Sequence, residues 1–323
     1  MHNRLDLAAQ LALRTREMMV RHLGAAALRA FADPDVTEIY VNPDGRLRLE
    51  RRSRGASVEA EVLEAEQVYR FLNTVASSLG LALDEGNPQI QAELPQEPFG
   101  GARLQGFVPP LVAAPCFVVR KLPDVVYSLD DYVEEEVLLP EHRDLLRTAV
   151  DQRWNVLVAG GTGSGKTTFA NALLLEIAER CPSDRIVVLE DTVELQSSAS
   201  DTLALRTTPE LSLADLVKAS LRTKPDRIVI GEVRDAAALD LLDAWATGHP
   251  GGVATLHATD PLGALHRLDR LAQRANVPSQ QALITEAVQL VVLIHGGHSR
   301  RRVREISHVR GLDAMGEFRL ETA

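Results

Sequence analysis

Short apolar runs alternate with longer, helically periodic stretches between residues 141 and 258. The apolar runs are bounded by turn residues and predict buried strands, and the periodic stretches predict helices. The predicted strands are Asn155–Ala159, Arg185–Leu189, Arg227–Ile230 and Gly252–Leu256, and the predicted helices are Glu141–Gln152, Lys166–Glu179, Leu213–Arg222 and Asp235–Ala246. Strands that alternate with helices form a mainly parallel sheet with helices on both faces, so this part of the chain is predicted to be α/β.

The first part of the chain mixes helix and strand signals instead. Helical periodicity runs from residue 5 to residue 28. Two short strand-like runs, Thr37–Val41 and Arg46–Arg51, flank the turn sequence Asn42–Gly45 and predict a hairpin. An amphipathic helix is then predicted over Leu63–Leu79. This mixture is typical of an α+β domain.

The two patterns divide the chain into two predicted domains. The predicted boundaries are residues 1–121 for a smaller amino-terminal α+β domain, 122–140 for a linker and 141–323 for the α/β domain. The linker holds the acidic run Asp130–Glu136, which is more typical of a solvated connection than of a core. At 323 residues, with 45% hydrophobic and 25% charged residues, the chain is long and apolar enough to form two cores.

The formal net charge of −10 lies almost wholly in the second part of the chain. Residues 1–121 carry 14 basic and 15 acidic side chains (14 − 15 = −1), and the remaining residues carry 21 and 30 (21 − 30 = −9). Because an acidic surface repels the phosphate backbone, we expect no sequence-specific nucleic-acid partner. The two cysteines, Cys116 and Cys181, cannot supply a four-cysteine metal site, so we expect no zinc.

The hydrophobic stretches predict a cytoplasmic protein with peripheral membrane contact at most. Charged residues interrupt the first 24 residues, which therefore lack the apolar segment of a signal peptide. The most apolar later stretch, Phe107–Val119, contains three prolines and is shorter than the ~20 residues that a spanning helix needs.

A phosphate-binding loop follows the first predicted strand of the α/β domain. Residues 160–167, Gly-Gly-Thr-Gly-Ser-Gly-Lys-Thr, match GxxxxGK[ST] between an apolar strand and a predicted helix. Glycines let backbone N–H groups turn toward phosphates, and the helix N-terminus adds a positive dipole. Lys166 is expected to neutralise the β- and γ-phosphates of ATP, and the Thr167 hydroxyl is expected to hold Mg²⁺. The candidate nucleotide-binding residues here are Gly160, Gly161, Thr162, Gly163, Ser164, Gly165, Lys166, Thr167 and Thr168.

Two further predicted strands end in carboxylates that suit ATP hydrolysis, which needs a group to activate water and a partner for the metal. One strand is followed by Glu190 and Asp191, and another is followed by Glu232. The carboxyl ends of parallel strands meet at one edge of the sheet, so these carboxylates are expected beside the phosphate loop. Glu194 would share the face of Glu190 only in a helix, and a solvated loop position is the favoured interpretation.

A histidine is predicted at the same edge, directly after the strand Gly252–Leu256. There, His257 can hydrogen-bond a γ-phosphate or the attacking water and so distinguish ATP from ADP. His249 lies in the preceding glycine-rich turn, and an ordinary structural role explains it equally well.

The order of these motifs resembles that of the type II/type IV secretion ATPase superfamily. The phosphate loop, residues 189–194 (LEDTVE), residues 221–235 (LRTKPDRIVIGEVRD) and residues 247–258 (TGHPGGVATLHA) are similar to its Walker A, Asp box, Walker B and His box. The length and the first 55 residues are most similar to the conjugal-transfer ATPases of bacterial type IV secretion, the TrbB type. Type II members carry a cysteine quartet after the His box, and this sequence has no cysteine there.

The resemblance implies a RecA-like P-loop domain and a Mg²⁺-dependent ATPase that forms a homohexameric ring. It implies that Glu190 is the general base and that Glu232 acts on the magnesium side, directly or through water. It also implies that arginines of the amino-terminal domain reach the phosphates, and Arg103 and Arg120 are the matching positions. Both arginines could contact the nucleotide of their own subunit or that of a neighbouring subunit. The candidate catalytic residues are therefore Glu190, Glu232, Lys166 and His257.

The implied function is ATP-driven assembly or substrate transfer in a conjugative type IV secretion system. The implied partners are further copies of the chain, other ATPases of that system and inner-membrane components, at the cytoplasmic face of the inner membrane. Two alternatives are a pilus extension or retraction ATPase of the same superfamily and a nucleotide-gated scaffold with little turnover. The acidic second domain disfavours a third, a DNA translocase.

Three further features have ambiguous or structural interpretations. The basic run 298–304 could touch nucleic acid or anionic lipid, but a solvated edge strand whose arginines oppose self-pairing is favoured. Arg222 and Arg234 fit either a phosphate contact or an ion pair with Glu232. Four leucines at partly helical spacing are expected in the core: Leu262, Leu265, Leu268 and Leu271.

Overall fold

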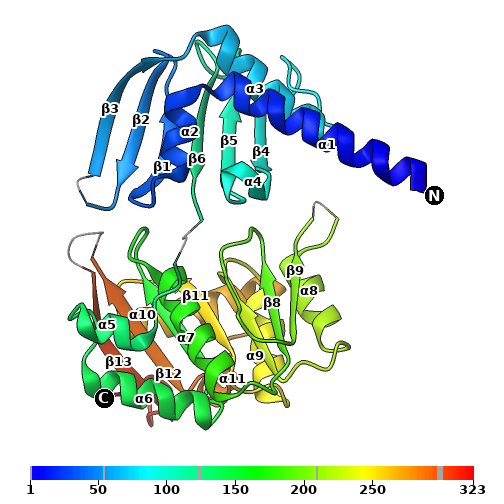
Figure 1. The fold of residues 1–323 in the computed structure, drawn as a ribbon. Coiled ribbons are helices and arrows are strands. Elements are labelled where there is room, and N and C mark those ends of the chain that lie inside the picture. Colours follow the sequence, from blue (N-terminus) through cyan, green and yellow to red (C-terminus); the bar gives the residue numbers. More distant parts are fainter. Residues whose placement is uncertain (1, 54, 123–124, 209, 297–300) are drawn as a thin grey trace. The chain divides into compact units, whose positions relative to one another are not determined.

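Two β-sheets organise the chain into two units (Figure 1). The computed structural model describes residues 2–53, 55–122, 125–208, 210–296 and 301–323. The first unit is Met1–Asp124 and the second is Val125–Ala323. No helix in the described ranges combines the length and the apolar character that crossing a bilayer requires.

The first unit is a six-stranded antiparallel sheet with helices packed on it, in the strand order β3-β2-β1-β6-β5-β4. Its elements are α1 (His2–Leu23), α2 (Ala25–Ala32), β1 (Val36–Val41), β2 (Arg46–Arg51), β3 (Gly55–Val62), α3 (Ala65–Ser78), β4 (Gln89–Glu93), α4 (Gln96–Phe99), β5 (Arg103–Phe107) and β6 (Cys116–Arg120). Buried and more exposed residues alternate along β2 and β4, because one face of the sheet packs on the helices.

The predicted hairpin is confirmed, since β1 and β2 pair antiparallel with Val41 opposite Leu47. The single helix predicted over residues 5–28 is wrong in one respect. Gly24 has a φ of +86°, in the region that favours glycine, and separates α1 from α2. A Cβ atom at this position would lie 2.8 Å from Oε1 of Glu61, so the break is also a close contact.

The second unit is an eight-stranded mixed sheet, ordered β14-β13-β12-β7-β11-β10-β8-β9. Its elements are α5 (Leu129–Glu134), α6 (Pro140–Asp151), β7 (Val156–Gly160), α7 (Lys166–Arg180), β8 (Ile186–Glu190), β9 (Thr202–Arg206), α8 (Leu213–Ser220), β10 (Arg227–Ile230), α9 (Ala237–Ala246), β11 (Val253–His257), α10 (Pro261–Ala272), the 3-10 turn η1 (Gln273–Ala275), α11 (Gln281–Ala287), β12 (Leu290–His295), β13 (Arg302–Leu312) and β14 (Phe318–Thr322). The run from β12 to β9 is parallel, and β13 pairs antiparallel with both β12 and β14.

Helices cover both faces of this sheet, which confirms the α/β prediction. One core lies between the sheet and α5–α7, and a second core lies between the sheet and α8–α11. Every residue of β7, β8 and β10 is buried, as expected of strands covered on both faces. Three of the four predicted core leucines are buried, whereas Leu262 is 41% exposed.

The segment expected to be a linker, residues 122–140, contains helix α5 and belongs to the second unit from residue 125 onward. Leu129 and Tyr132 are buried in the core below α6 and α7. Ser128 and Asp131 form a capping box at the start of α5. The acidic run therefore begins a packed helix, because its apolar residues face the core while its first carboxylates cap the helix.

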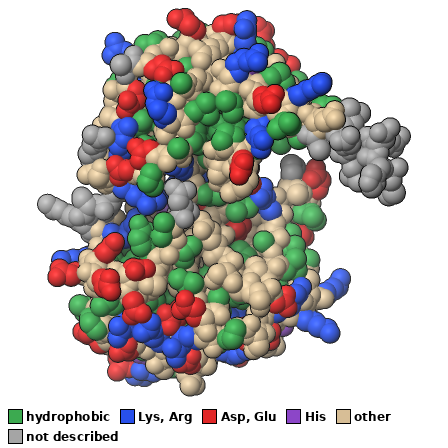
Figure 2. All heavy atoms as spheres, viewed as in Figure 1, with side chains coloured by type: hydrophobic (Ala, Val, Ile, Leu, Met, Phe, Trp, Pro, Cys, Tyr) green, Lys and Arg blue, Asp and Glu red, His purple; other side chains and the backbone are tan. Residues whose placement is uncertain are grey.

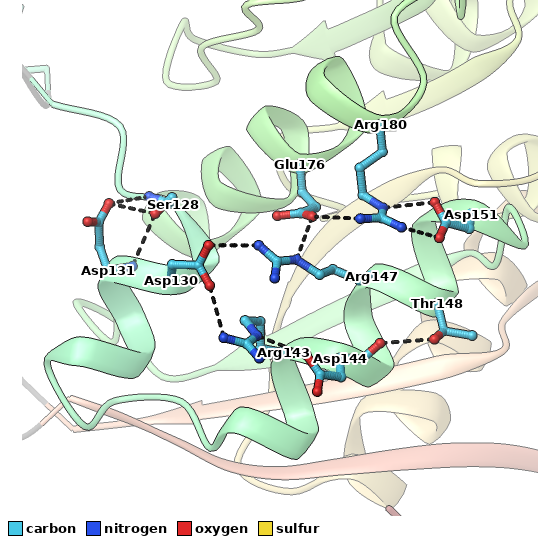
Figure 3. A network of polar contacts seen from close by, with 10 residues as sticks. All are labelled: Ser128, Asp130, Asp131, Arg143, Asp144, Arg147, Thr148, Asp151, Glu176 and Arg180. Carbon is cyan, nitrogen blue, oxygen red and sulfur yellow. Dashed lines mark hydrogen bonds and ion pairs between the residues drawn. The ribbon is translucent and has the colours of Figure 1, made fainter.

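Ion pairs tie α5 and α6 to α7, the helix that follows the phosphate loop (Figure 3). Arg147 donates 2.8 Å hydrogen bonds to Asp130 on α5 and to the buried carboxylate of Glu176 on α7. Arg180 pairs with Asp151 at the end of α6. Figure 2 shows acidic and basic side chains intermixed over the same face of the second unit.

A buried ion pair lies at the amino-terminal end of β10. Arg227 is 1% exposed, and its guanidinium donates to Asp184 at 2.7 Å and to the carbonyls of Gly251 and Val150. Asp184 also pairs with Arg153 at 2.5 Å. One guanidinium thus joins the segments that precede three different strands.

We expect Arg227→Met to lower the free energy of unfolding of the second unit by about 3–5 kcal/mol, because it leaves a buried carboxylate and two carbonyls short of a partner. Both tryptophans of the chain, Trp154 and Trp245, lie in this unit, so urea unfolding followed by tryptophan fluorescence reports on it alone. Arg270→Met, at an exposed position, is the control and should change stability by less than about 0.5 kcal/mol. Equal losses in the two variants would contradict the structural role of Arg227.

Candidate functional site

The phosphate loop leaves β7 at Gly160 and enters α7 at Lys166. Gly163 and Gly165 have φ values of +70° and +93°, so both need the left-handed conformation that glycine adopts without strain. A Cβ atom at Gly160 would lie 2.5 Å from the carbonyl oxygen of Ile294, which excludes a side chain there. The glycines therefore let the loop turn sharply and let its first residue pack against the backbone of the neighbouring strand β12.

The loop residues differ in how far solvent reaches them. Gly161, Thr162 and Gly163 are exposed, Ser164 is buried, and Gly165, Thr167 and Thr168 are half-buried. The hydroxyl of Ser164 donates to the carbonyl of Gly161 at 2.9 Å, and Nζ of Lys166 donates to the same carbonyl at 2.8 Å. These two bonds hold the loop closed around the amino end of α7.

A chain of polar contacts runs from the phosphate loop across two strands. Nζ of Lys166 lies 3.2 Å from Nδ1 of His257, and Nε2 of His257 lies 3.1 Å from Oε1 of Glu232. An ammonium group can only donate, so Nδ1 accepts and the imidazole proton sits on Nε2, from which it is donated to Glu232. Arg234 donates to the other oxygen of Glu232 at 2.6 Å. The sequence allowed Arg234 either a phosphate contact or an ion pair with Glu232, and the structure shows the ion pair.

The charges around this chain shift two pKa values. Burial lowers the pKa of His257, and the positive charges of Lys166, Arg267 and Arg234 lower it further against the opposing effect of Glu232. Burial raises the pKa of Glu232, but the hydrogen bond and charge of Arg234, with smaller contributions from His257 and Lys166, outweigh it and hold that pKa below its ordinary value. At neutral pH, the imidazole is therefore neutral and the carboxylate is ionised.

Glu190 ends β8 at the same edge of the sheet and is 4% exposed. Its Oε1 accepts the backbone N–H groups of Glu194 and Leu195, at 2.9 and 2.8 Å. Asn171 on α7 holds this loop from the other side, through the carbonyl of Glu194 and the N–H of Gln196. Glu194 therefore lies in a loop, as predicted, and contributes its backbone N–H to Glu190. The two N–H groups give the carboxylate of Glu190 a defined orientation.

The two arginines expected to reach the phosphates lie in the first unit, on neighbouring strands. Arg103 on β5 is directly opposite Arg120 on β6. Arg120 is in turn opposite Glu38 on β1, and Arg103 is opposite Glu93 on β4. Directly paired residues in an antiparallel sheet share a face, so the four side chains form a charged row across four strands. Arg120 is exposed and Arg103 is half-buried.

Sequence reasoning missed one residue near the phosphate loop. Arg301 belongs to the basic run that was interpreted as a solvated edge strand, yet a Cβ atom at Gly165 would lie 2.5 Å from its Cζ and Nε. The edge-strand interpretation fits Arg302 and Arg304, which are exposed in a part of β13 that pairs with β12, whereas β14 pairs with β13 only from Ser307 onward. It is wrong for Arg301, which turns toward the phosphate loop. Residues 298–300 of the run lie outside the described residues. No local pattern in the sequence indicates this contact, because it depends on β12 lying parallel to β7.

Comparison with known proteins shows the family. Residues 21–309 match the family model described as type II/IV secretion system protein. The chain therefore belongs to this family.

Within the family, the TrbB-type assignment is supported along nearly the whole chain. The chain is 43% identical over 303 residues to the conjugal transfer protein TrbB of Rhizobium radiobacter, which covers 93% of each chain. It is 42% identical over 314 residues to the probable conjugal transfer protein TrbB of Sinorhizobium fredii, covering 96% of this chain and 95% of the relative.

Solved structures of traffic ATPases share the fold. The pilus retraction motor PilT with bound ADP has a TM-score of 0.64 at 20% identity, over 92% of this chain and 80% of its own. The Legionella pneumophila ATPase DotB has a TM-score of 0.63 at 22% identity, over 85% and 77%.

We expect His257 to titrate below pH 6.5. Lys166→Met should raise the pKa of His257, because it removes a positive charge, and Glu232→Gln should lower that pKa, because it removes a negative charge. Histidine ring resonances followed by NMR between pH 4.5 and 8, assigned with His257→Gln, measure this. The unfolded chain takes up the proton at a higher pH than the folded chain, so acidification through this range should also lower the free energy of unfolding. A wild-type midpoint at or above 6.5 would contradict the geometry.

Proposed function

We propose that the chain is the ATP-hydrolysing motor of a bacterial conjugative type IV secretion system and works as a homohexameric ring. The observation that carries this proposal is the convergence of the phosphate loop, Glu190, Glu232 and His257 at one edge of a parallel sheet. The names of the relatives, conjugal transfer protein TrbB in two bacteria, support the system to which we assign it.

The second unit is proposed to be a RecA-like P-loop domain, and its loop is proposed to bind the phosphates of ATP. Backbone N–H groups at the start of α7 and the charge of Lys166 attract the β- and γ-phosphates. The hydroxyl of Thr167 and the carboxylate of Glu232 are oxygen donors of the kind that Mg²⁺ takes, and they would hold the ion that accompanies ATP. When bound, Mg²⁺ supplies positive charge that stabilises the phosphoryl group during transfer.

Glu190 is proposed to be the general base. Two backbone N–H groups fix one of its oxygens, so its carboxylate is oriented before water arrives. A carboxylate in such a position takes the proton as the water attacks the γ-phosphate. His257, neutral and bonded to both Lys166 and Glu232, is proposed to respond to the presence of the γ-phosphate, because any change at Lys166 alters its hydrogen bond.

The first unit is proposed to be the α+β domain, residues 1–121, that supplies Arg103 and Arg120 to the phosphates. The ATPase domain is proposed to comprise residues 141–323, and the segment 122–140 between them contains α5. The charged row on the sheet of the first unit supports this role of the two arginines, since a strand surface can present two guanidinium groups at once. Arrival of these groups would stabilise charge in the transition state and couple turnover to domain closure.

The proposed partners are neighbouring copies of the chain, other ATPases of the secretion system and inner-membrane components, at the cytoplasmic face of the inner membrane. The similarity to conjugal transfer proteins supports this placement. Closure and opening of the domains during hydrolysis would act mechanically on these partners.

We expect wild-type Mg²⁺-ATP turnover per subunit to rise with protein concentration, and Glu190→Gln to lower it about 10²-fold or more, because an amide cannot take the proton from water. A phosphate-release assay over a concentration series measures both effects. Glu179→Gln, which changes an exposed carboxylate at the carboxyl end of α7, far from the phosphate loop, is the matched control and should retain activity. Equal, feeble turnover in wild type and Glu190→Gln would favour the nucleotide-gated scaffold over the motor.

Arg120→Ala should lower the turnover number about tenfold or more, since it removes an exposed guanidinium that we assign to transition-state charge. Stability should hardly change, because the side chain is exposed. The control is Arg46→Ala, an exposed arginine on β2 of the same sheet. Steady-state kinetics and thermal unfolding separate the two effects, and unchanged turnover in Arg120→Ala would refute the assignment.

A further inference from the structure

Arg301 reaches the phosphate loop from the segment that leads into β13. The space above Gly165 is filled by its guanidinium, because a Cβ atom there would lie 2.5 Å from Cζ and Nε of Arg301 and 3.0 Å from Nη2. Gly165 is the residue directly before Lys166 at the start of α7. A positive group therefore lies in van der Waals contact with the backbone that precedes the phosphate-binding lysine.

Two polar atoms beside the loop are buried and make no hydrogen bond of good geometry among the described residues: Nε of Arg301 and the hydroxyl of Tyr132. The Arg301 side chain nevertheless approaches this hydroxyl closely enough to act on it as a hydrogen-bonding group. Tyr132 is 4% exposed, and burial, the largest effect, raises the pKa of its hydroxyl to about 12, although the charge and the hydrogen bond of Arg301 oppose it. The phenol is therefore neutral and can donate a proton to an acceptor. Buried polar groups of this kind need a partner, and an anionic ligand would serve both.

The fold determines this meeting point. β12 runs parallel to β7 with Ile294 paired to Gly160, so the chain leaves β12 at the edge from which the phosphate loop leaves β7. The backbone N–H of Val303 then donates to the carbonyl of Val137, which ties the start of β13 to the segment after α5. Tyr132 lies on that helix and packs on Phe169 of α7, with ring centroids 5.3 Å apart. Arg301 and Tyr132 are thus held on one side of the loop.

No carboxylate in the described ranges forms an ion pair with Arg301. The charge of Glu135 acts on the hydroxyl of Tyr132, but Glu135 is exposed and makes no ion pair with Arg301 there. The next two arginines of the run, Arg302 and Arg304, are exposed. A structural salt bridge therefore does not explain why this one arginine turns inward onto a glycine of the phosphate loop.

We propose that Arg301 is a phosphate-binding residue of the nucleotide site, assisted by the hydroxyl of Tyr132. This proposal rests on the proposed function and adds a cation from the segment that leads into β13 to Lys166 and the backbone of the loop. A guanidinium presents several N–H donors in a fixed plane, and charge-assisted hydrogen bonds to phosphate oxygens are the strong ones. Its ligand class is a diphosphate or triphosphate, free or as part of a nucleotide.

The test compares Arg301→Gln with Arg302→Gln, a change of the same chemistry at the exposed neighbouring position. Affinities for ADP and for inorganic pyrophosphate are measured by calorimetry at one Mg²⁺ concentration. Arg301→Gln should weaken both about tenfold or more, because it removes a charge-assisted contact, and Arg302→Gln should leave both within about twofold. Tyr132→Phe should cause a smaller loss that largely disappears in the Arg301→Gln background. Unfolding followed by tryptophan fluorescence checks that each variant folds.

The binding results distinguish the role of Arg301 from the proposed function. Equal affinities in Arg301→Gln and Arg302→Gln would overturn the proposal, and so would a loss for ADP without a loss for pyrophosphate, since that pattern indicates a contact to the base or the sugar. Absence of ADP and pyrophosphate binding in the wild type would overturn the proposed function as well. Normal wild-type binding with an unaffected Arg301→Gln variant would overturn only the role of Arg301.

Discussion

The position of β7 between two parallel neighbours is the constraint on which the site depends. β11 and β12 flank β7 in register, so that His257 lies opposite Gly160 on one side and Ile294 lies opposite the same glycine on the other. Every segment that leaves these strands must therefore begin within a few ångströms of the phosphate loop. This register brings together a lysine, a histidine and, from the end of the chain, an arginine.

A second effect follows from the burial of so many charges at one edge. Lys166 is 7% exposed and Glu190 is 4% exposed, and a lone buried charge would be costly. Hydrogen bonds offset this cost. Lys166 donates to neutral His257, Glu232 accepts from Arg234, and Glu190 accepts from two backbone N–H groups. Such an arrangement is sensitive to any new negative charge at the loop, which is the property that a nucleotide-responsive site needs.

Polar networks away from the site join neighbouring elements of the second unit. Arg227 and Asp184 join segments at the amino-terminal ends of the strands, opposite to the edge that holds the phosphate loop. Arg147 and Arg180 join α6 to α7, and α7 begins at Lys166 (Figure 3). Because these bonds link neighbouring elements, the loop is followed by a helix whose carboxyl-terminal turns are tied to α6. The carboxylates of α5 and Glu176 therefore belong to the frame of the site.

The sequence by itself determined the α/β pattern of the second unit, the phosphate loop and the strand ends that carry Glu190, Glu232 and His257, because these signals are local: apolar runs, glycine spacing and the residue after a strand. Tertiary structure alone decided that α5 is packed and that Arg234 pairs with Glu232. It also brought Arg301 to Gly165 from 136 positions further along the chain (301 − 165). Such contacts depend on strand order, and strand order follows from how whole elements pack, which no local pattern of residues records.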